Sequence, residues 1–217
     1  MRQAEKFYDK HAAGYEAKFD NVFARGIKRK EEEDVLEFLF EHLHPGGRLL
    51  ELGCGTGIFT IPVAQKGYDV TAVDMSQGML DELQKKLDAN DVKTVTLVKS
   101  DVEGLADLGK FDGVYGIGLL EYLKSPEGCV RRAGELLKPG GITCFTGPSV
   151  SYNGVMYYII SLFRKRMRMQ LFTRRRFRKA VEGAGLDFVA LRKVGWHLPL
   201  MRSLTSIFAG RKPVSEG

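Results

Sequence analysis

A glycine-rich turn from a strand into a helix is predicted at Glu51-Leu52-Gly53-Cys54-Gly55-Thr56-Gly57. Its last five residues, which we call the glycine turn (residues 53–57), can bend tightly and let a ligand approach without meeting a Cβ atom. A dinucleotide fingerprint that began at Gly53 would require glycine at position 58, and that residue is Ile58. The spacing therefore indicates a nucleotide-like ligand and argues against a dinucleotide.

Three acidic residues stand at the ends of predicted strands. Glu51 precedes the glycine turn, and a carboxylate there suits a ligand with an ammonium group better than a pyrophosphate, which it would repel. Asp74 follows Gly57 by 17 residues, where an acid can accept hydrogen bonds from both hydroxyls of a ribose. Asp101 can accept from an exocyclic amine such as that of adenine. Taken singly, Asp74 and Asp101 also fit helix caps or turn acids, but together they favour ligand binding.

Strand and helix patterns alternate along the first two thirds of the chain. Apolar and β-branched segments predict strands at 48–52, 69–73, 94–99, 111–117 and 142–147. Helical patterns precede them at 3–19 and 27–44, and separate them in the stretch ending at 66, at 76–89 and at 127–137. Because parallel strands need crossover connections, this alternation predicts an α/β fold with a mostly parallel sheet and helices on both faces.

The last third follows another pattern. Residues 157–172 form an amphipathic helix candidate, and Thr173 is a good N-cap for a further helix over 174–184 that Gly185 would end. Two more strands are predicted at 186–194 and 203–210.

The positive charge is concentrated in one segment. The chain has 33 Lys and Arg against 27 Asp and Glu, a net charge of +6, yet nine of the basic side chains and no acidic one lie within residues 164–179. This distribution disfavours a surface that is basic throughout. It is compatible with a single basic element that faces an anionic partner. Arg174, Arg175 and Arg176 fall in the first turn of a predicted helix, where cations oppose the helix dipole. We expect either a solvated face or, because this cost has no local compensation in the sequence, contact with an acidic membrane through residues 155–179.

Three widely spaced cysteines without a Cys-x-x-Cys pair indicate a reducing compartment and no zinc site. The charged first residues do not resemble a signal peptide, and no apolar run is long enough to span a membrane. These features predict a cytoplasmic protein, with peripheral membrane contact left open.

Six segments in a fixed order resemble the motifs of class I S-adenosylmethionine-dependent methyltransferases, of the group that acts on small molecules. LLELGCGTG (49–57) resembles the glycine motif, VTAVDMS (70–76) the ribose motif and VKSDVEGL (98–105) the adenine motif. FDGVYGIGLLEYL (111–123) resembles the fourth strand with its substrate-side loop, LLKPGG (136–141) the approach to the fifth strand, and SIFAGRKP (206–213) the antiparallel last strand.

The resemblance implies a Rossmann-like, doubly wound sheet of seven strands that is mostly parallel with an antiparallel last strand. It also implies one methyltransferase domain over residues 1–217. Within it we expect an N-terminal helical lid (1–44), a cofactor-binding core (45–147), a helical basic cover (148–184) and the final strands (185–212).

S-adenosyl-L-methionine is the cofactor that the resemblance implies. Glu51 would support its methionine ammonium, Asp74 its ribose with Met75 packed on the adenine, and Asp101 with the Val102 backbone the adenine edge. The implied cofactor-binding residues are Glu51, Gly53, Cys54, Gly55, Gly57, Asp74, Met75, Asp101, Val102, Gly116 and Ile117. Tyr8, Asp9 and Tyr15 resemble the lid, in which Tyr15 would cover the cofactor.

No single residue stands out as catalytic. The candidates are Tyr15, Glu121, Tyr122 and His197, with His11 as a further histidine near the lid. Methyl transfer is an in-line displacement at an activated sulfonium, so positioning and desolvation can supply much of the catalysis without a general base. The function predicted is methyl transfer to a small, lipophilic or membrane-associated acceptor. The alternatives are an RNA methyltransferase that uses the basic cluster at 164–179, disfavoured by the absence of an appended RNA-binding domain, and a noncatalytic binding module.

Overall fold

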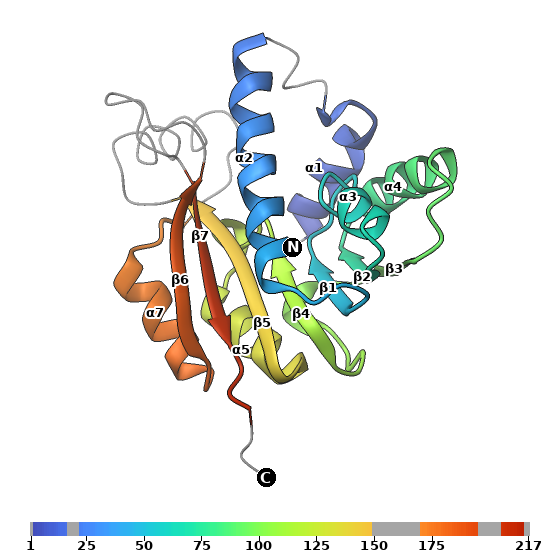
Figure 1. Ribbon diagram of the computed structural model, residues 1–217. Coiled ribbons are helices and arrows are strands. Elements are labelled where there is room, and N and C mark those ends of the chain that lie inside the picture. The colour runs from blue at the N-terminus through green and yellow to red at the C-terminus, as the bar shows by residue number, and fades with distance from the viewer. Residues whose placement is uncertain (1, 17–21, 149–169, 195–204, 215–217) are drawn as a thin grey trace.

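A seven-stranded sheet forms the centre of the protein (Figure 1). The computed structural model describes residues 2–16, 22–148, 170–194 and 205–214. The strand order is β3-β2-β1-β4-β5-β7-β6. In chain order the strands are β1 (Arg48–Leu52), β2 (Asp69–Asp74), β3 (Val95–Lys99), β4 (Phe111–Gly116), β5 (Leu137–Pro148), β6 (Asp187–Val194) and β7 (Thr205–Arg211).

The first five strands run parallel, and β7 lies antiparallel between β5 and β6. In β1 and β2 nearly every residue is buried, as expected of strands that are covered on both faces, whereas β3 at the edge of the sheet has no fully buried residue. β1 pairs with β2 on one side and with β4 on the other, so the order of the strands reverses beside β1. Open α/β sheets bind ligands at such a reversal, beyond the carboxyl ends of the strands.

Helices cover both faces of the sheet (Figure 1). One core packs α2 (Val22–His42), α3 (Thr60–Gln65) and α4 (Gln77–Ala89) against one face, and a second core packs α5 (Pro126–Leu136) and α7 (Arg174–Gly183) against the other. α1 (Arg2–His11) and the 3₁₀ turn η1 (Ala12–Gly14) lie beside α4. Two more 3₁₀ turns, η3 (Val102–Gly104) and η4 (Leu120–Tyr122), follow β3 and β4.

The fold class and the antiparallel last strand are confirmed. The predicted N-cap at Thr173 is also present, and its side chain accepts a hydrogen bond from Arg176 N. Ser76 caps α4 in the same way by accepting a hydrogen bond from Met79 N. Short polar side chains at these positions satisfy amide groups that have no partner within the helix.

Several predicted boundaries differ from those in the structure, among them the start of the second helix, which lies at Val22 rather than at Ile27. The first helix was expected to run to residue 19, but α1 ends at His11 and the chain continues as η1. The fifth strand begins at Leu137 rather than Ile142, because Leu137 already pairs with Phe111 and a register shift then accommodates the Pro139-Gly140 stretch. Of the predicted helix over 157–172, residues 157–169 lie outside the described residues, and the last three are not helical.

Within the described residues, no helix is both long enough and apolar enough to cross a membrane.

Candidate functional site

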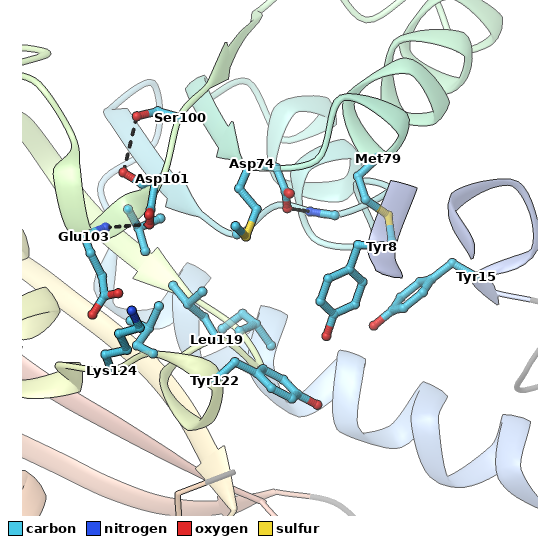
Figure 2. Close-up of a pocket in the computed structure, with 17 residues that line it drawn as sticks. Tyr8, Tyr15, Asp74, Met79, Ser100, Asp101, Glu103, Leu119, Tyr122 and Lys124 are labelled. Carbon is cyan, nitrogen blue, oxygen red and sulfur yellow. Dashed lines mark hydrogen bonds between the residues drawn. The ribbon is translucent and has the colours of Figure 1, made fainter. Parts of the chain in front are cut away.

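A pocket of about 180 Å³ opens at the carboxyl ends of β1, β2, β3 and β4 (Figure 2). Its lining comes from the glycine turn, the ends of β2 and β3, the loop after β4, the start of α4 and the N-terminal segment (residues 5–16). The residues that line it are Tyr8, Tyr15, Gly53, Gly55, Asp74, Met75, Met79, Ser100, Asp101, Val102, Glu103, Ile117, Gly118, Leu119, Tyr122, Leu123 and Lys124. Residues that are distant in sequence thus meet where the strand order reverses.

Asp74 ties the glycine turn to the start of α4. One carboxylate oxygen accepts a hydrogen bond from Gly55 N at 2.9 Å, and the other accepts from Ser76 N at 2.8 Å. Each carboxylate oxygen offers two acceptor sites, so both can still accept from a ligand hydroxyl. Burial raises the pKa of Asp74 above its ordinary value, although the backbone amides oppose this shift. Asp74 is therefore a desolvated acceptor fixed at the pocket wall.

Asp101 and Val102 lie at the end of the pocket beyond β3. The Asp101 carboxylate caps η3 by accepting a hydrogen bond from Glu103 N at 3.0 Å (Figure 2). Val102 is buried, and its backbone enters η3 directly behind that cap. An acid and a backbone segment thus lie together in the pocket wall, where the sequence predicted recognition of an adenine edge.

Three tyrosines, two from the N-terminal segment and one from η4, lie at the other end of the pocket (Figure 2). The ring of Tyr8 meets the ring of Tyr15 edge-on at a centroid distance of 6.2 Å, and that of Tyr122 at 6.5 Å. Ile117 and Leu119 add apolar surface. This wall offers flat aromatic surface and phenolic hydroxyls, which suits a ligand with an apolar body and a polar group.

Glu51 is 2% exposed and does not line the pocket. One of its oxygens accepts hydrogen bonds from Thr60 Oγ1 at 2.6 Å and from the Tyr115 hydroxyl at 3.0 Å. Burial is the main cause that raises its pKa to about 7; the two hydrogen bonds oppose the shift, and the charge of Asp74 adds to it. Support of a ligand ammonium by Glu51 stays a prediction, and such a cation would favour the ionised carboxylate.

The raised pKa of Glu51 predicts a specific pH dependence of stability. The folded state binds the proton more tightly than the unfolded state, so stability is lost as pH rises from about 4.5 to about 7, by roughly 3 kcal/mol. In Glu51→Gln the side chain keeps an acceptor for Thr60 and Tyr115 but cannot ionise. Between pH 4.5 and pH 8 the parent should lose this stability and Glu51→Gln should not. Urea unfolding should therefore show the free energy of unfolding of Glu51→Gln, relative to that of the parent, rising by roughly 3 kcal/mol over this range. A constant difference between the two proteins across this range would contradict the assignment.

Most of the predicted site residues line the pocket, and the others lie beside it or outside the described residues. Gly53, Gly55, Asp74, Met75, Asp101, Val102 and Ile117 line the pocket, whereas Cys54, Gly57 and Gly116 lie beside or beneath it. Among the catalytic candidates, Tyr15 and Tyr122 line the pocket and Glu121 is buried outside its lining. His197 lies outside the described residues. His11 contacts Phe7 O through Nδ1 at 2.7 Å and does not line the pocket.

Several lining residues were not predicted. Leu119, Leu123 and Lys124 belong to the loop after β4, and Met79 lies in the first turn of α4. Their proximity to the ends of predicted strands was an available signal, because loops at carboxyl ends of parallel strands build such sites.

The described part of the chain contains no group of three or more His, Cys, Asp or Glu side chains that could hold a metal ion. Burial also raises the pKa of the Cys129 thiol, to about 12, so it stays protonated at neutral pH.

The sequence of the chain is similar to those of curated methyltransferases. A ubiquinone biosynthesis O-methyltransferase from Xanthomonas axonopodis pv. citri (strain 306) is 34% identical over 112 residues, which cover 49% of this chain and 45% of that protein. The protein of the same name from Coxiella burnetii (strain Dugway 5J108-111) is 28% identical over 116 residues, 53% of this chain and 49% of that protein. The chain thus matches less than half the length of these curated relatives.

The solved structure of magnesium protoporphyrin IX methyltransferase from Synechocystis PCC 6803 with bound SAH superposes with a TM-score of 0.78 at 17% identity. The superposition covers 96% of this chain and 98% of that one, so the two share a fold. The sequence model of a methyltransferase domain matches residues 23–191, which include the glycine turn and all strands from β1 to β5. The chain belongs to this methyltransferase domain family.

Proposed function

We propose that the protein transfers the methyl group of S-adenosylmethionine to a small acceptor with an apolar body. The observation that carries the proposal is the pocket, in which the glycine turn, Asp74 and Asp101 meet at the carboxyl ends of neighbouring strands. This arrangement suits a nucleoside with an attached amino acid.

The residues present fit that cofactor. Asp74 has acceptor capacity left after binding Gly55 N and Ser76 N, as two ribose hydroxyls require. Met75 and Val102 supply apolar contacts for a flat base, and Asp101 supplies an acceptor for its amine. The glycine turn presents backbone without side chains beside the methionine portion.

When bound, the cofactor supplies a methyl group activated on a sulfonium. The protein then has to hold the acceptor atom in line with that group and exclude water. Tyr8, Tyr15 and Tyr122 are placed to do both, because their rings form a wall of the pocket and their hydroxyls can orient a polar group of the acceptor. Tyr15 and Tyr122 are the candidates for contact with the reacting atom.

The acceptor class is supported from two directions. The wall around Tyr122, Leu119 and Leu123 is apolar and aromatic, so it favours an acceptor with an apolar body. The curated relatives are named for O-methylation in ubiquinone biosynthesis, a pathway of lipophilic molecules. We therefore propose a hydroxyl group on a small lipophilic molecule as the methylated group.

A transfer assay with isotopically labelled S-adenosylmethionine and a cell extract tests this proposal. We expect label in a small, organic-extractable product and formation of S-adenosylhomocysteine. Label in the RNA fraction would instead support the RNA methyltransferase alternative, and no transfer with any fraction would support a noncatalytic module.

Peripheral contact with an acidic membrane is a second part of the proposal. Arg174, Arg175 and Lys179 are exposed on α7, and within the described residues no hydrogen bond or ion pair is assigned to their side chains. Arg176 is different: it pairs with Glu127 at 2.6 Å and lies over the Phe172 ring, so the expectation that its charge lacks local compensation was wrong. Sedimentation with vesicles that contain acidic lipid, at low and high salt, tests the contact. Equal binding to neutral and acidic vesicles would contradict it.

A further inference from the structure

The N-terminal segment (residues 5–16) is fastened to the pocket at two points, each an acidic residue that directly follows a tyrosine of the pocket wall. Asp9 follows Tyr8, and Glu16 follows Tyr15. Neighbouring residues point in different directions, so each tyrosine can enter the pocket while the acid beside it bonds elsewhere. Both acids bond to elements that also build the cofactor site.

Asp9 bonds to the first turn of α4. Its Oδ1 accepts hydrogen bonds from Ser76 Oγ at 2.6 Å and from Gly78 N at 3.0 Å. Ser76 N in turn donates to Asp74, which accepts from Gly55 N. A continuous set of hydrogen bonds therefore links the N-terminal segment to Asp74 and the glycine turn. These bonds also lower the pKa of Asp9, chiefly that from Ser76, so the carboxylate is ionised at neutral pH.

Glu16 bonds to the glycine turn itself. Its Oε1 accepts a hydrogen bond from Thr56 Oγ1 at 2.5 Å and pairs with Lys86 of α4. Lys86 also donates to Thr56 O at 3.0 Å, so the three side chains form one cluster. Thr56 is 3% exposed and cannot follow a displaced Glu16 without disturbing the turn.

Gly78 allows this close approach of α1 to α4. A Cβ atom at position 78 would lie 3.1 Å from Asp9 O and 3.3 Å from Ala12 Cβ, which is closer than ordinary van der Waals contact. A glycine in the first turn of a helix costs stability relative to alanine. The docked N-terminal segment explains why glycine is needed at this position.

We infer that Asp9 and Glu16 are positioning residues: they hold the N-terminal segment on the cofactor site and thereby fix Tyr8 and Tyr15 in the pocket wall. The inference rests on the proposed function, because the site so completed is the one proposed for S-adenosylmethionine. The inference goes beyond the proposed function because it assigns the positioning of Tyr8 and Tyr15 to Asp9 and Glu16. These acids, like their partners Ser76 and Gly78, lie outside the ligand's own contacts.

Gly78→Ala separates this role from a general effect on folding. The added methyl group favours helix formation in α4 but displaces α1. Gly183→Ala in α7 is a matched control, because its Cβ atom meets nothing within 4 Å. Asp9→Asn removes the charge from the contact with Ser76, and Asp88→Asn makes the same change on the exposed surface of α4, where Asp88 accepts from Gln84.

Hydrogen exchange and calorimetry on the full chain test the inference. For Gly78→Ala and Asp9→Asn we expect faster amide exchange over residues 5–16 without ligand and about fivefold weaker S-adenosylmethionine binding, comparable to loss of one helix-cap contact. The melting temperature of Gly78→Ala should not fall below that of Gly183→Ala. Exchange and affinity equal to those of the two controls would overturn the inference. A parent protein that does not bind S-adenosylmethionine, yet shows faster exchange in the two variants, would refute the proposed function while leaving the docking intact.

Discussion

Asp74→Ala is expected to weaken S-adenosylmethionine binding by about 10- to 150-fold, because a hydrogen bond to a charged group contributes about 1.5 to 3 kcal/mol. The loss has two sources. The ribose would lose its acceptor, and Gly55 N and Ser76 N would lose the carboxylate that holds the glycine turn against α4.

Titration calorimetry measures this effect, and Asp107→Ala supplies its control. Asp107 also accepts a hydrogen bond from a backbone amide, that of Gly109, but lies in an exposed loop outside the pocket lining. Its replacement should leave the affinity unchanged. Parent-like affinity in Asp74→Ala would show that this acid is only a turn acid.

Gly57→Ala is expected to lower the free energy of unfolding by about 2 to 6 kcal/mol, since strained backbone and overpacking each cost about 1 to 3 kcal/mol. Gly57 has φ of +85°, which disfavours any residue with a Cβ atom. In addition, that Cβ atom would lie 2.2 Å from Leu83 Cδ1, and Leu83 is fully buried in the core between α4 and the sheet.

Gly67→Ala isolates the backbone contribution in urea unfolding experiments. Gly67 has φ of +90°, but a Cβ atom there meets nothing within 4 Å. The difference between the two variants therefore measures the collision with Leu83. Equal destabilisation by the two substitutions would mean that the glycine turn does not depend on close contact with α4.

The sequence was sufficient to predict that the glycine turn, Asp74 and Asp101 meet in one place. Gly53, Gly55, Asp74 and Asp101 lie at or just beyond the ends of strands whose apolar runs are easy to recognise. In a parallel sheet all such ends lie on the same edge, so short-range patterns place these residues together without further information.

The buried position of Glu51 could not be predicted in the same way. Glu51 lies within β1, and its side chain points to Thr60 of α3 and Tyr115 of β4. Which face of a strand meets the pocket depends on how the neighbouring elements pack, and an acidic residue before a glycine turn gives no sign of this.

Specific contacts between residues far apart in the chain could likewise not be predicted from the sequence. Asp9 and Ser76 are 67 positions apart, and Arg176 and Glu127 are 49 apart. Each residue alone reads as an ordinary exposed charge or cap. Only the packing of α1 on α4 and of α7 on α5 turns these residues into specific pairs.

Titration of the parent protein with S-adenosylmethionine, and separately with NAD, is the most direct test of the cofactor assignment. Without a glycine at position 58, the pocket should bind S-adenosylmethionine saturably at one site per chain and should not bind NAD. Saturable binding of NAD, or no heat of binding from S-adenosylmethionine, would contradict the account.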